Sequence, residues 1–267
     1  MILTDRFSYV HIPKTGGTFV TTKLFQTFVR QDFRTKAKKM LSSFSDDDYA
    51  PWPVEGKLYG GPYGSFQHID KHAGACEFPT RKTVVATIRN PYSWYESLYN
   101  FRVWVKFEPK FRKHVEGFDD RYPHFPDLSF GEFLHLIDEW AGINSFGHYT
   151  RVFVRKCFPH PFVLEQRMDD EYWKGAYKDD LLIDEFLFTS TLSKSLFFFL
   201  MNHGIPSDLA KALPVRPTGS KRRAKPTWTP ELRSFVRVRE RVLFQVFPHF
   251  DSVRLPSVIM SPSEVAA

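Results

Sequence analysis

The sequence of 267 residues has only two cysteines, Cys76 and Cys157, and no long apolar segment. Two cysteines cannot form a disulfide framework, so we expect reduced thiols in a reducing compartment. A membrane-spanning helix needs about 20 consecutive apolar residues, whereas the most hydrophobic run extends only from Leu196 to Met201. Charges interrupt the N-terminal segment by Asp5, which excludes the apolar core of a signal peptide. These absences predict a soluble, cytoplasmic protein without a membrane span.

Acidic residues are also fewer than basic ones. The chain has 37 Lys and Arg against 30 Asp and Glu, a net charge of +7 and a pI near 9.3. Such a balance favours anionic partners: phosphates, sulfated or carboxylated sugars, nucleic acid or a membrane surface. The hydrophobic share of 42% and the length are sufficient for one domain with a real core. We find no internal repeat and no linker, and predict a single domain over residues 1–267.

The clearest periodic segments place a strand before a glycine turn. Residues 7–12 read as a strand, 13–17 as a turn and about 18–29 as a helix. The β-branched run at 82–88 is typical of a parallel strand buried on both faces. Asn90-Pro91 then begins a second helix, because proline is favoured at the first helical position. The predicted apolar face of that helix comprises Trp94, Leu98, Phe101 and Val105.

The remaining segments complete an α/β pattern. Ser129 and Glu132 form a capping box before a helix, and Gly204 closes a helix predicted over 193–203. Further predictions are a surface excursion at 42–64, strands at 162–164 and 182–188, a helix over 229–247, and loop insertions at 106–128 and 206–228. Strands that alternate with helices predict a three-layer α/β/α fold with a central parallel sheet.

The segment KTGGT, residues 14–18, is the first candidate site. A glycine turn between a strand and a helix exposes backbone N–H groups at the positive end of the helix dipole, which suits an anion. Lys14 adds a mobile charge, while Thr15 and Thr18 add hydroxyls. The alternative is an ordinary turn with a solvated lysine. The lysine precedes the glycines, so the segment does not match the GxxxxGK[ST] pattern of Walker-type NTPases.

The second candidate site is RNPYSWYESLYNFR, residues 89–102. Arg89 ends the buried strand, where ligands of open α/β sheets bind. Ser93 and Ser97 are one helical turn apart, and a guanidinium with a serine hydroxyl can clamp a phosphate monoester. The alternative is an arginine that caps a strand and serines on a wet helix face.

Together HIPKTGGT and RNPYSWYESLY resemble the two nucleotide motifs of sulfotransferases that depend on 3′-phosphoadenosine 5′-phosphosulfate (PAPS), above all the carbohydrate branch. The resemblance implies a P-loop-like fold and PAPS as donor. It implies that Lys14, Thr15, Gly16, Gly17 and Thr18 bind the 5′-phosphosulfate. Arg89 and Ser97 would bind the 3′-phosphate, without a metal ion.

Sulfuryl transfer to a hydroxyl also needs a base, for which histidine is suited near neutral pH. Related enzymes have a similar Lys-His stretch before the 3′-phosphate strand. We favour His72 in QHIDKH, with His68 next and Asp70 as a possible partner. His68 and His72 would share a face if this segment is helical. A zinc site is a poorer interpretation, because no further ligands follow at suitable spacing.

The basic segment at 216–226 is a third feature. This segment is either a solvated loop or a loop that binds the donor phosphates or an anionic acceptor. Similar enzymes often use a late basic loop for the nucleotide, which makes Lys221, Arg222 and Arg223 candidate donor ligands. One departure is that relatives often have a glutamate after the fourth strand, where this chain has Thr189 to Thr191; Glu165 is a weak substitute.

We therefore expect a sulfotransferase that acts on a hydroxyl-bearing acceptor, a carbohydrate, and not on nucleic acid. Trp94, Tyr95 and Trp104 either stack on a sugar or belong to the core. The alternatives are an ATP-dependent small-molecule kinase on the same scaffold, and a non-catalytic module that binds acidic glycans or nucleic acid through the basic segment.

Overall fold

A mixed sheet of six strands forms the centre of the described structure, in the order β3-β4-β1-β2-β5-β6. The structure is a computed structural model that describes residues 1–28, 57–61, 64–69, 73–77, 82–141, 146–159, 171–207 and 226–251. The strands are β1 Ile2–Thr4, β2 Phe7–Val10, β3 Leu58–Gly61, β4 Gly64–His68, β5 Thr83–Ile88 and β6 Glu185–Phe188. Strands β2, β5 and β6 are parallel, whereas β1 pairs antiparallel with β2 and β4, and β3 with β4.

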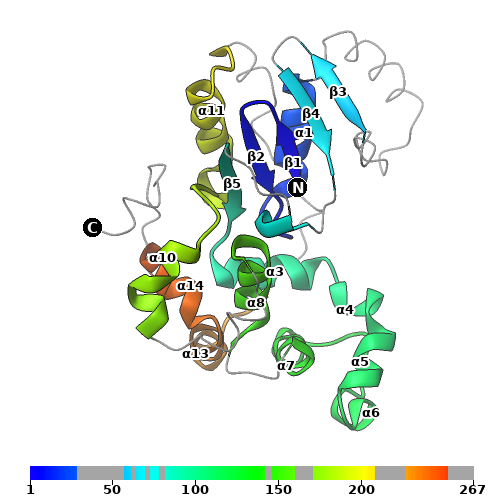
Figure 1. The fold of residues 1–267 in the computed structure, drawn as a ribbon. Helices are drawn as coiled ribbons and strands as arrows, with labels where there is room; N and C mark the ends of the chain where they lie inside the picture. Colours follow the sequence, from blue (N-terminus) through cyan, green and yellow to red (C-terminus); the bar gives the residue numbers. More distant parts are fainter. Residues whose placement is uncertain are drawn as a thin grey trace, which may run out of the picture.

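Helices α1 and α11 lie beside the sheet, and most of the other helices gather below it in the view of Figure 1. The longer ones are α1 Gly17–Phe28, α3 Pro91–Asn100, α7 Phe130–Ala141, α8 His148–Cys157, α11 Leu192–Asn202 and α13 Pro230–Arg239. The shorter ones are α4 Val103–Lys106, α5 Glu108–His114, α6 Phe118–Arg121, α10 Tyr177–Asp180 and α14 Arg241–Val246. A π-helical turn at Tyr172–Ala176 precedes α10, and 3₁₀ turns lie at Ala75–Glu77, Thr189–Thr191 and Pro248–Phe250.

Alternate residues of the parallel strands pack against helices on opposite faces of the sheet. One face buries Tyr9, Val85 and Leu187 against α1 and α11. The other buries residues such as Ala86 and Phe186 against α3, α7, α8 and α14. The period of two along a strand causes this division. The arrangement is compatible with three α/β/α layers.

Most local predictions are confirmed. The first strand, the glycine turn and α1 lie where expected, and β5 is buried from Val84 to Ile88. Pro91 occupies the first turn of α3, and its cap Asn90 accepts a hydrogen bond from the backbone of Tyr92. The capping box before α7 forms in both directions between Ser129 and Glu132. The predicted strand at 182–188 is β6, which is shorter.

The predicted central parallel sheet is found only in part, because the sheet is mixed: two of its strand pairs are parallel and three are antiparallel. On one side of β2 the three strand pairs β1–β2, β1–β4 and β3–β4 are antiparallel. Strand β1 has three residues, too few to show the alternation of apolar and polar side chains that predicts a strand. Strand β4 includes Gln67 and His68, the first two residues of the QHIDKH segment for which we considered a helix. His68 therefore lies in a strand and cannot share a helix face as proposed.

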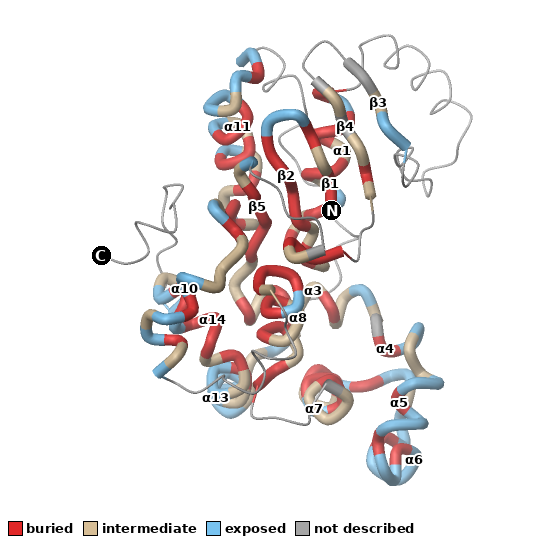
Figure 2. Tube along the Cα trace, in the orientation of Figure 1, coloured by how far each residue is buried: buried red, intermediate tan, exposed pale blue. Residues whose placement is uncertain are grey.

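The predicted loop at 106–128 is also wrong, because α5 and α6 lie within it. Pro109 occupies the first turn of α5, a position that tolerates proline. Helices α4, α5 and α6 extend as an arm whose surface is mostly exposed (Figure 2). Helix α3 ends at Asn100, so Phe101 and Val105 are exposed rather than part of its apolar face.

The last predicted helix is divided in two. Thr229 caps α13 as expected, but the helix ends at Arg239 and α14 follows after Glu240. The predicted strand at 162–164 lies outside the described residues, as does most of 206–228. None of the helices in the described ranges is long and apolar enough to cross a bilayer.

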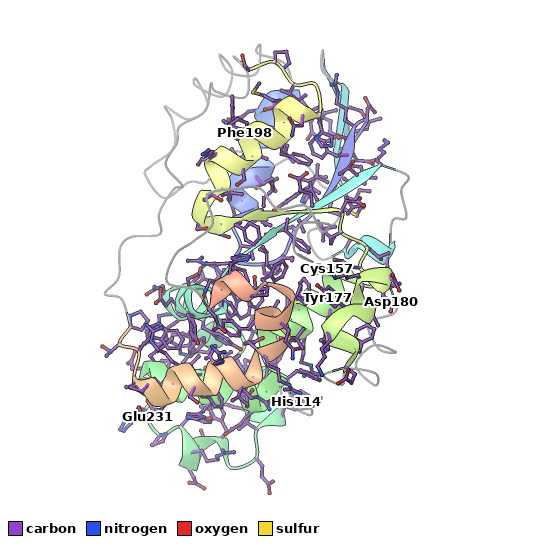
Figure 3. The ribbon with its side chains drawn as sticks, turned by 90° about the vertical axis from the view of Figure 1, so that its left-hand side faces the viewer. His114, Cys157, Tyr177, Asp180, Phe198 and Glu231 are labelled. Carbon is purple, nitrogen blue, oxygen red and sulfur yellow. The ribbon has the colours of Figure 1, made fainter. Side chains whose placement is uncertain are left out.

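The two cysteines are free thiols. Cys157 is buried within the helical layer below the sheet, and Cys76 is half-buried. Figure 3 labels Cys157, and also Phe198, which α11 carries at the far end of the molecule. Burial raises the pKa of the Cys157 thiol well above its ordinary value, so it is an inert interior group.

Candidate anion-binding site

The loop after β2 has the backbone geometry of an anion site. Lys14 and Gly16 have positive φ angles of 66° and 94°, and Thr15 lies between them with a negative φ. Alternation of this kind turns successive backbone N–H groups toward one concavity, as in phosphate-binding loops. Helix α1 begins immediately afterwards at Gly17, which adds the positive end of its dipole.

Each of the two glycines is required for its own reason. Gly16 combines its positive φ with a close neighbour, because a Cβ there would lie 2.5 Å from Leu192 Cδ2. A Cβ on Gly17 would lie 1.9 Å from Cδ2 of His11. The imidazole of His11 therefore lies against the first turn of α1. Sequence reasoning did not single out His11, although it is part of the HIPKTGGT motif.

Thr15 turns its hydroxyl into the protein. Its Oγ1 lies 2.6 Å from the carbonyl oxygen of Ile12, which can only accept, and 2.6 Å from Thr87 Oγ1. Thr87 Oγ1 in turn lies 2.9 Å from the hydroxyl of Tyr9. Because each hydroxyl has one proton, the donors must run from Tyr9 to Thr87 to Thr15 to Ile12. Thr15 therefore offers a ligand its backbone, while Thr18 is exposed at the helix start.

Two side chains hold the carbonyl groups of the same loop. Trp94 Nε1 donates to the Pro13 carbonyl at 2.8 Å. Thr189 Oγ1 lies 2.8 Å from the carbonyl oxygen of Thr15 and 3.0 Å from that of Ile88. Thr189 ties together the ends of β2, β5 and β6. These hydrogen bonds fix the carbonyl groups on both sides of Lys14.

Arg89 brings the second motif to the first. Its Nη1 donates to the Lys14 carbonyl at 3.2 Å, and its Nε donates to Ser93 Oγ at 3.0 Å. Ser93 Oγ donates to the Asn90 carbonyl at 3.0 Å. Ser93, and not Ser97, is therefore the serine that contacts Arg89; Ser97 lies one turn further along α3 and is half-exposed.

The site carries an excess of positive charge. Burial, with repulsion from Lys106 and Arg89, lowers the pKa of Lys14 to about 8. Burial also lowers the pKa of Arg89, and electrostatic attraction to Tyr149 and Glu96 offsets part of this lowering. Lys14 Nζ lies 3.0 Å from the centroid of the Phe101 ring, and Lys106 Nζ lies 4.4 Å from it. Three neighbouring cations destabilise one another, so a bound anion would relieve the repulsion.

The predicted base and basic segment are placed less completely. His68 is buried in β4, where it is paired with Ile2 of β1, on the antiparallel side of the sheet. His72, together with Lys221, Arg222 and Arg223, lies outside the described residues, as do Asp70 and Glu165. In the described ranges no group of three or more His, Cys, Asp or Glu has the geometry of a metal site.

The tryptophans next to the site belong to the core. Trp94, Tyr95 and Trp104 are at most 4% exposed, so stacking on a sugar is not their role in this structure. Trp94 instead stacks on Tyr149, with ring centroids 4.2 Å apart and planes at 5°. Thr87 and Tyr149 support the loops of the site, and sequence reasoning missed both. The one signal in the sequence was the polar Thr87 within the apolar run TVVATI.

The chain matches no family model, no curated protein and no solved structure. The interpretation of the site therefore depends on its own geometry and on the resemblance of the two motifs.

Proposed function

We propose that this protein is a PAPS-dependent O-sulfotransferase of P-loop-like fold that transfers a sulfuryl group to a hydroxyl of a carbohydrate acceptor. The observation that carries the proposal is the direct contact between the two motifs, in which the Arg89 guanidinium donates to the carbonyl of Lys14. PAPS has anionic groups at two positions of one nucleoside. Two adjoining cationic loops at the ends of neighbouring parallel strands fit such a donor.

Each loop has a distinct part in the proposed binding mode. The N–H groups of the glycine loop, with Lys14, bind the 5′-phosphosulfate. Arg89 binds the 3′-phosphate with Ser97, and the observed contact adds Ser93 to this set. Lys221, Arg222 and Arg223 remain proposed ligands of the donor.

The reaction needs no redox partner and no metal in this proposal. The acceptor oxygen forms a bond to sulfur while the bond from sulfur to the bridging phosphate oxygen breaks. The acceptor proton passes to a base, for which His72 remains our candidate; buried His68 is less suited. Negative charge then develops on the 5′-phosphate of the departing 3′,5′-ADP, where Lys14 and the backbone N–H groups stabilise it.

Calorimetry with product nucleotides tests the donor assignment. We expect 3′,5′-ADP to bind more tightly than 5′-AMP in a magnesium-free buffer, because only 3′,5′-ADP has the 3′-phosphate that Arg89 would bind. A charge-assisted contact is worth about 1.5–3 kcal/mol, or roughly 10- to 150-fold in Kd. Equal affinities would refute the assignment. Preference for ATP with magnesium would favour the kinase, and salt-sensitive binding of acidic polymers that survives Lys14→Ala would favour the binding module.

A further inference from the structure

Tyr149 supports both loops of the candidate site from the first turn of α8. Its hydroxyl accepts the backbone N–H of Arg89 at 3.0 Å. Its ring stacks on Trp94, whose indole donates to the Pro13 carbonyl. Tyr149 is fully buried, so it cannot itself contact a ligand. One side chain thus reaches the Arg89 loop through its hydroxyl and the glycine loop through its ring.

Glu240 fixes the start of α8, and therefore Tyr149. It lies between α13 and α14 and is 0% exposed. One carboxylate oxygen accepts the backbone N–H of Tyr149 at 3.1 Å and the hydroxyl of Tyr95. The other accepts the N–H and the hydroxyl of Thr150, each at 2.7 Å. A Cβ on Gly147 would lie 2.0 Å from Glu240 Oε1, so the glycine permits this approach.

The energetic cost of burying the Glu240 carboxylate argues that this carboxylate fixes the position of Tyr149. Burial raises the pKa of Glu240, while the donated hydrogen bonds oppose the shift. A buried carboxylate that is balanced by hydrogen bonds is an expensive way to stabilise a helix start, and such networks often select one conformation. A serine or aspartate cap would serve α8 alone. Only a group reaching from α13 and α14 ties the C-terminal helices to Arg89.

We propose that Tyr149 is a positioning residue that sets Arg89 for the 3′-phosphate, and that Glu240 holds Tyr149 in place. This inference rests on the proposed function, because it assigns the 3′-phosphate to Arg89. It separates the two duties of Tyr149: the hydroxyl serves the 3′-phosphate loop, and the ring serves the 5′-phosphosulfate loop.

The decisive variant is Tyr149→Phe, which removes the hydroxyl and keeps the stacked ring. We expect calorimetry to show 3′,5′-ADP bound about 3- to 10-fold more weakly, the size of one net hydrogen bond. Binding of 5′-AMP should stay within about twofold. A purely structural role would weaken both nucleotides alike, or lower only the melting temperature.

Two further variants frame the result. Glu240→Gln should weaken the binding of both nucleotides, because its amide cannot accept all four donors and Tyr149 then loses the position of its hydroxyl and of its ring together. Asp138→Asn is the matched control. Arg239 precedes Glu240 in the chain, and its Nε lies 2.6 Å from Asp138 Oδ1, so this variant breaks an ion pair next to Glu240 without changing Glu240 itself. It should lower stability and leave the ratio of the two affinities unchanged. If Glu240→Gln does not fold, Tyr149→Phe still decides.

The outcomes separate this inference from the function on which it rests. Wild-type protein that fails to prefer 3′,5′-ADP over 5′-AMP refutes the donor assignment, and the inference with it. Wild-type preference that Tyr149→Phe leaves intact refutes the inference alone. Selective loss in Tyr149→Phe, with the ratio kept in Asp138→Asn, supports both.

Discussion

Replacement of Lys14 by methionine should stabilise the ligand-free protein at pH 7 and strongly reduce the proposed sulfotransferase activity. Burial and the nearby cations Lys106 and Arg89 lower the pKa of Lys14 from 10.5 to about 8. At 1.36 kcal/mol per pKa unit, this depression corresponds to roughly 3 kcal/mol against the charged form. Lys14 is only half-buried, so solvent screening reduces the penalty to about 1–2 kcal/mol. The lost contact with Phe101 offsets about 0.5 kcal/mol of that.

The stabilisation should depend on pH in a defined direction. Below about pH 8 Lys14 is charged in both the folded and the unfolded state, and the folded state bears the full penalty. Between about pH 8 and 10.5 the folded state releases the proton while the unfolded chain keeps it. The unfolded state then binds more protons, so wild-type stability gains from this group as pH rises. The difference between Lys14→Met and wild type should therefore shrink over that range.

Urea unfolding at pH 7 and at two or three higher values measures this difference. We expect about 1 kcal/mol at pH 7, or roughly 2–4 °C in Tm for a chain of this size. Turnover should fall by about 10²–10³, the loss typical of removing one stabiliser of developing charge. A variant that is less stable than wild type at pH 7, or a difference that grows with pH, would refute the reasoning.

Two further predictions concern the support of the loop and the base. Thr87→Val removes the middle of the chain of hydroxyls between Tyr9 and Thr15, and should lower the free energy of unfolding by about 1–3 kcal/mol in urea titrations; an unchanged value would show that the chain of donors is unimportant. His72→Ala should lose about 10²–10⁴ in rate, keep normal 3′,5′-ADP binding, and lose the acid limb of the pH–rate profile near its reference pKa of about 6.5. Near-normal turnover in the folded variant would transfer the assignment to His68, whose alanine variant is the control.

Short-range features could be predicted because their causes lie within a few residues. The capping box of Ser129 and Glu132, Pro91 at the start of α3, and the glycine turn at 16–17 all formed as expected. The same local reasoning failed at 106–128, where charges and prolines suggested a loop. Pro109 lies in the first turn of α5, where its missing N–H has no helical partner to lose.

The support of the candidate site was beyond sequence reasoning. Thr189 is 174 residues from Thr15 in the chain, and Glu240 is 91 residues from Tyr149. Nothing within a short window distinguishes these residues from ordinary surface or core positions. The choice of Ser93 over Ser97 likewise depends on where the Arg89 side chain lies.

The sequence alone determined the strand–turn–helix units and the residue types that offer cationic loops, because strand period, glycine conformation and helix caps are local properties. The tertiary structure decided the antiparallel half of the sheet, the inward hydroxyl of Thr15 and the contact of Arg89 with Lys14. It also decided the depressed pKa of Lys14, because burial and neighbouring charge exist only once distant segments pack together.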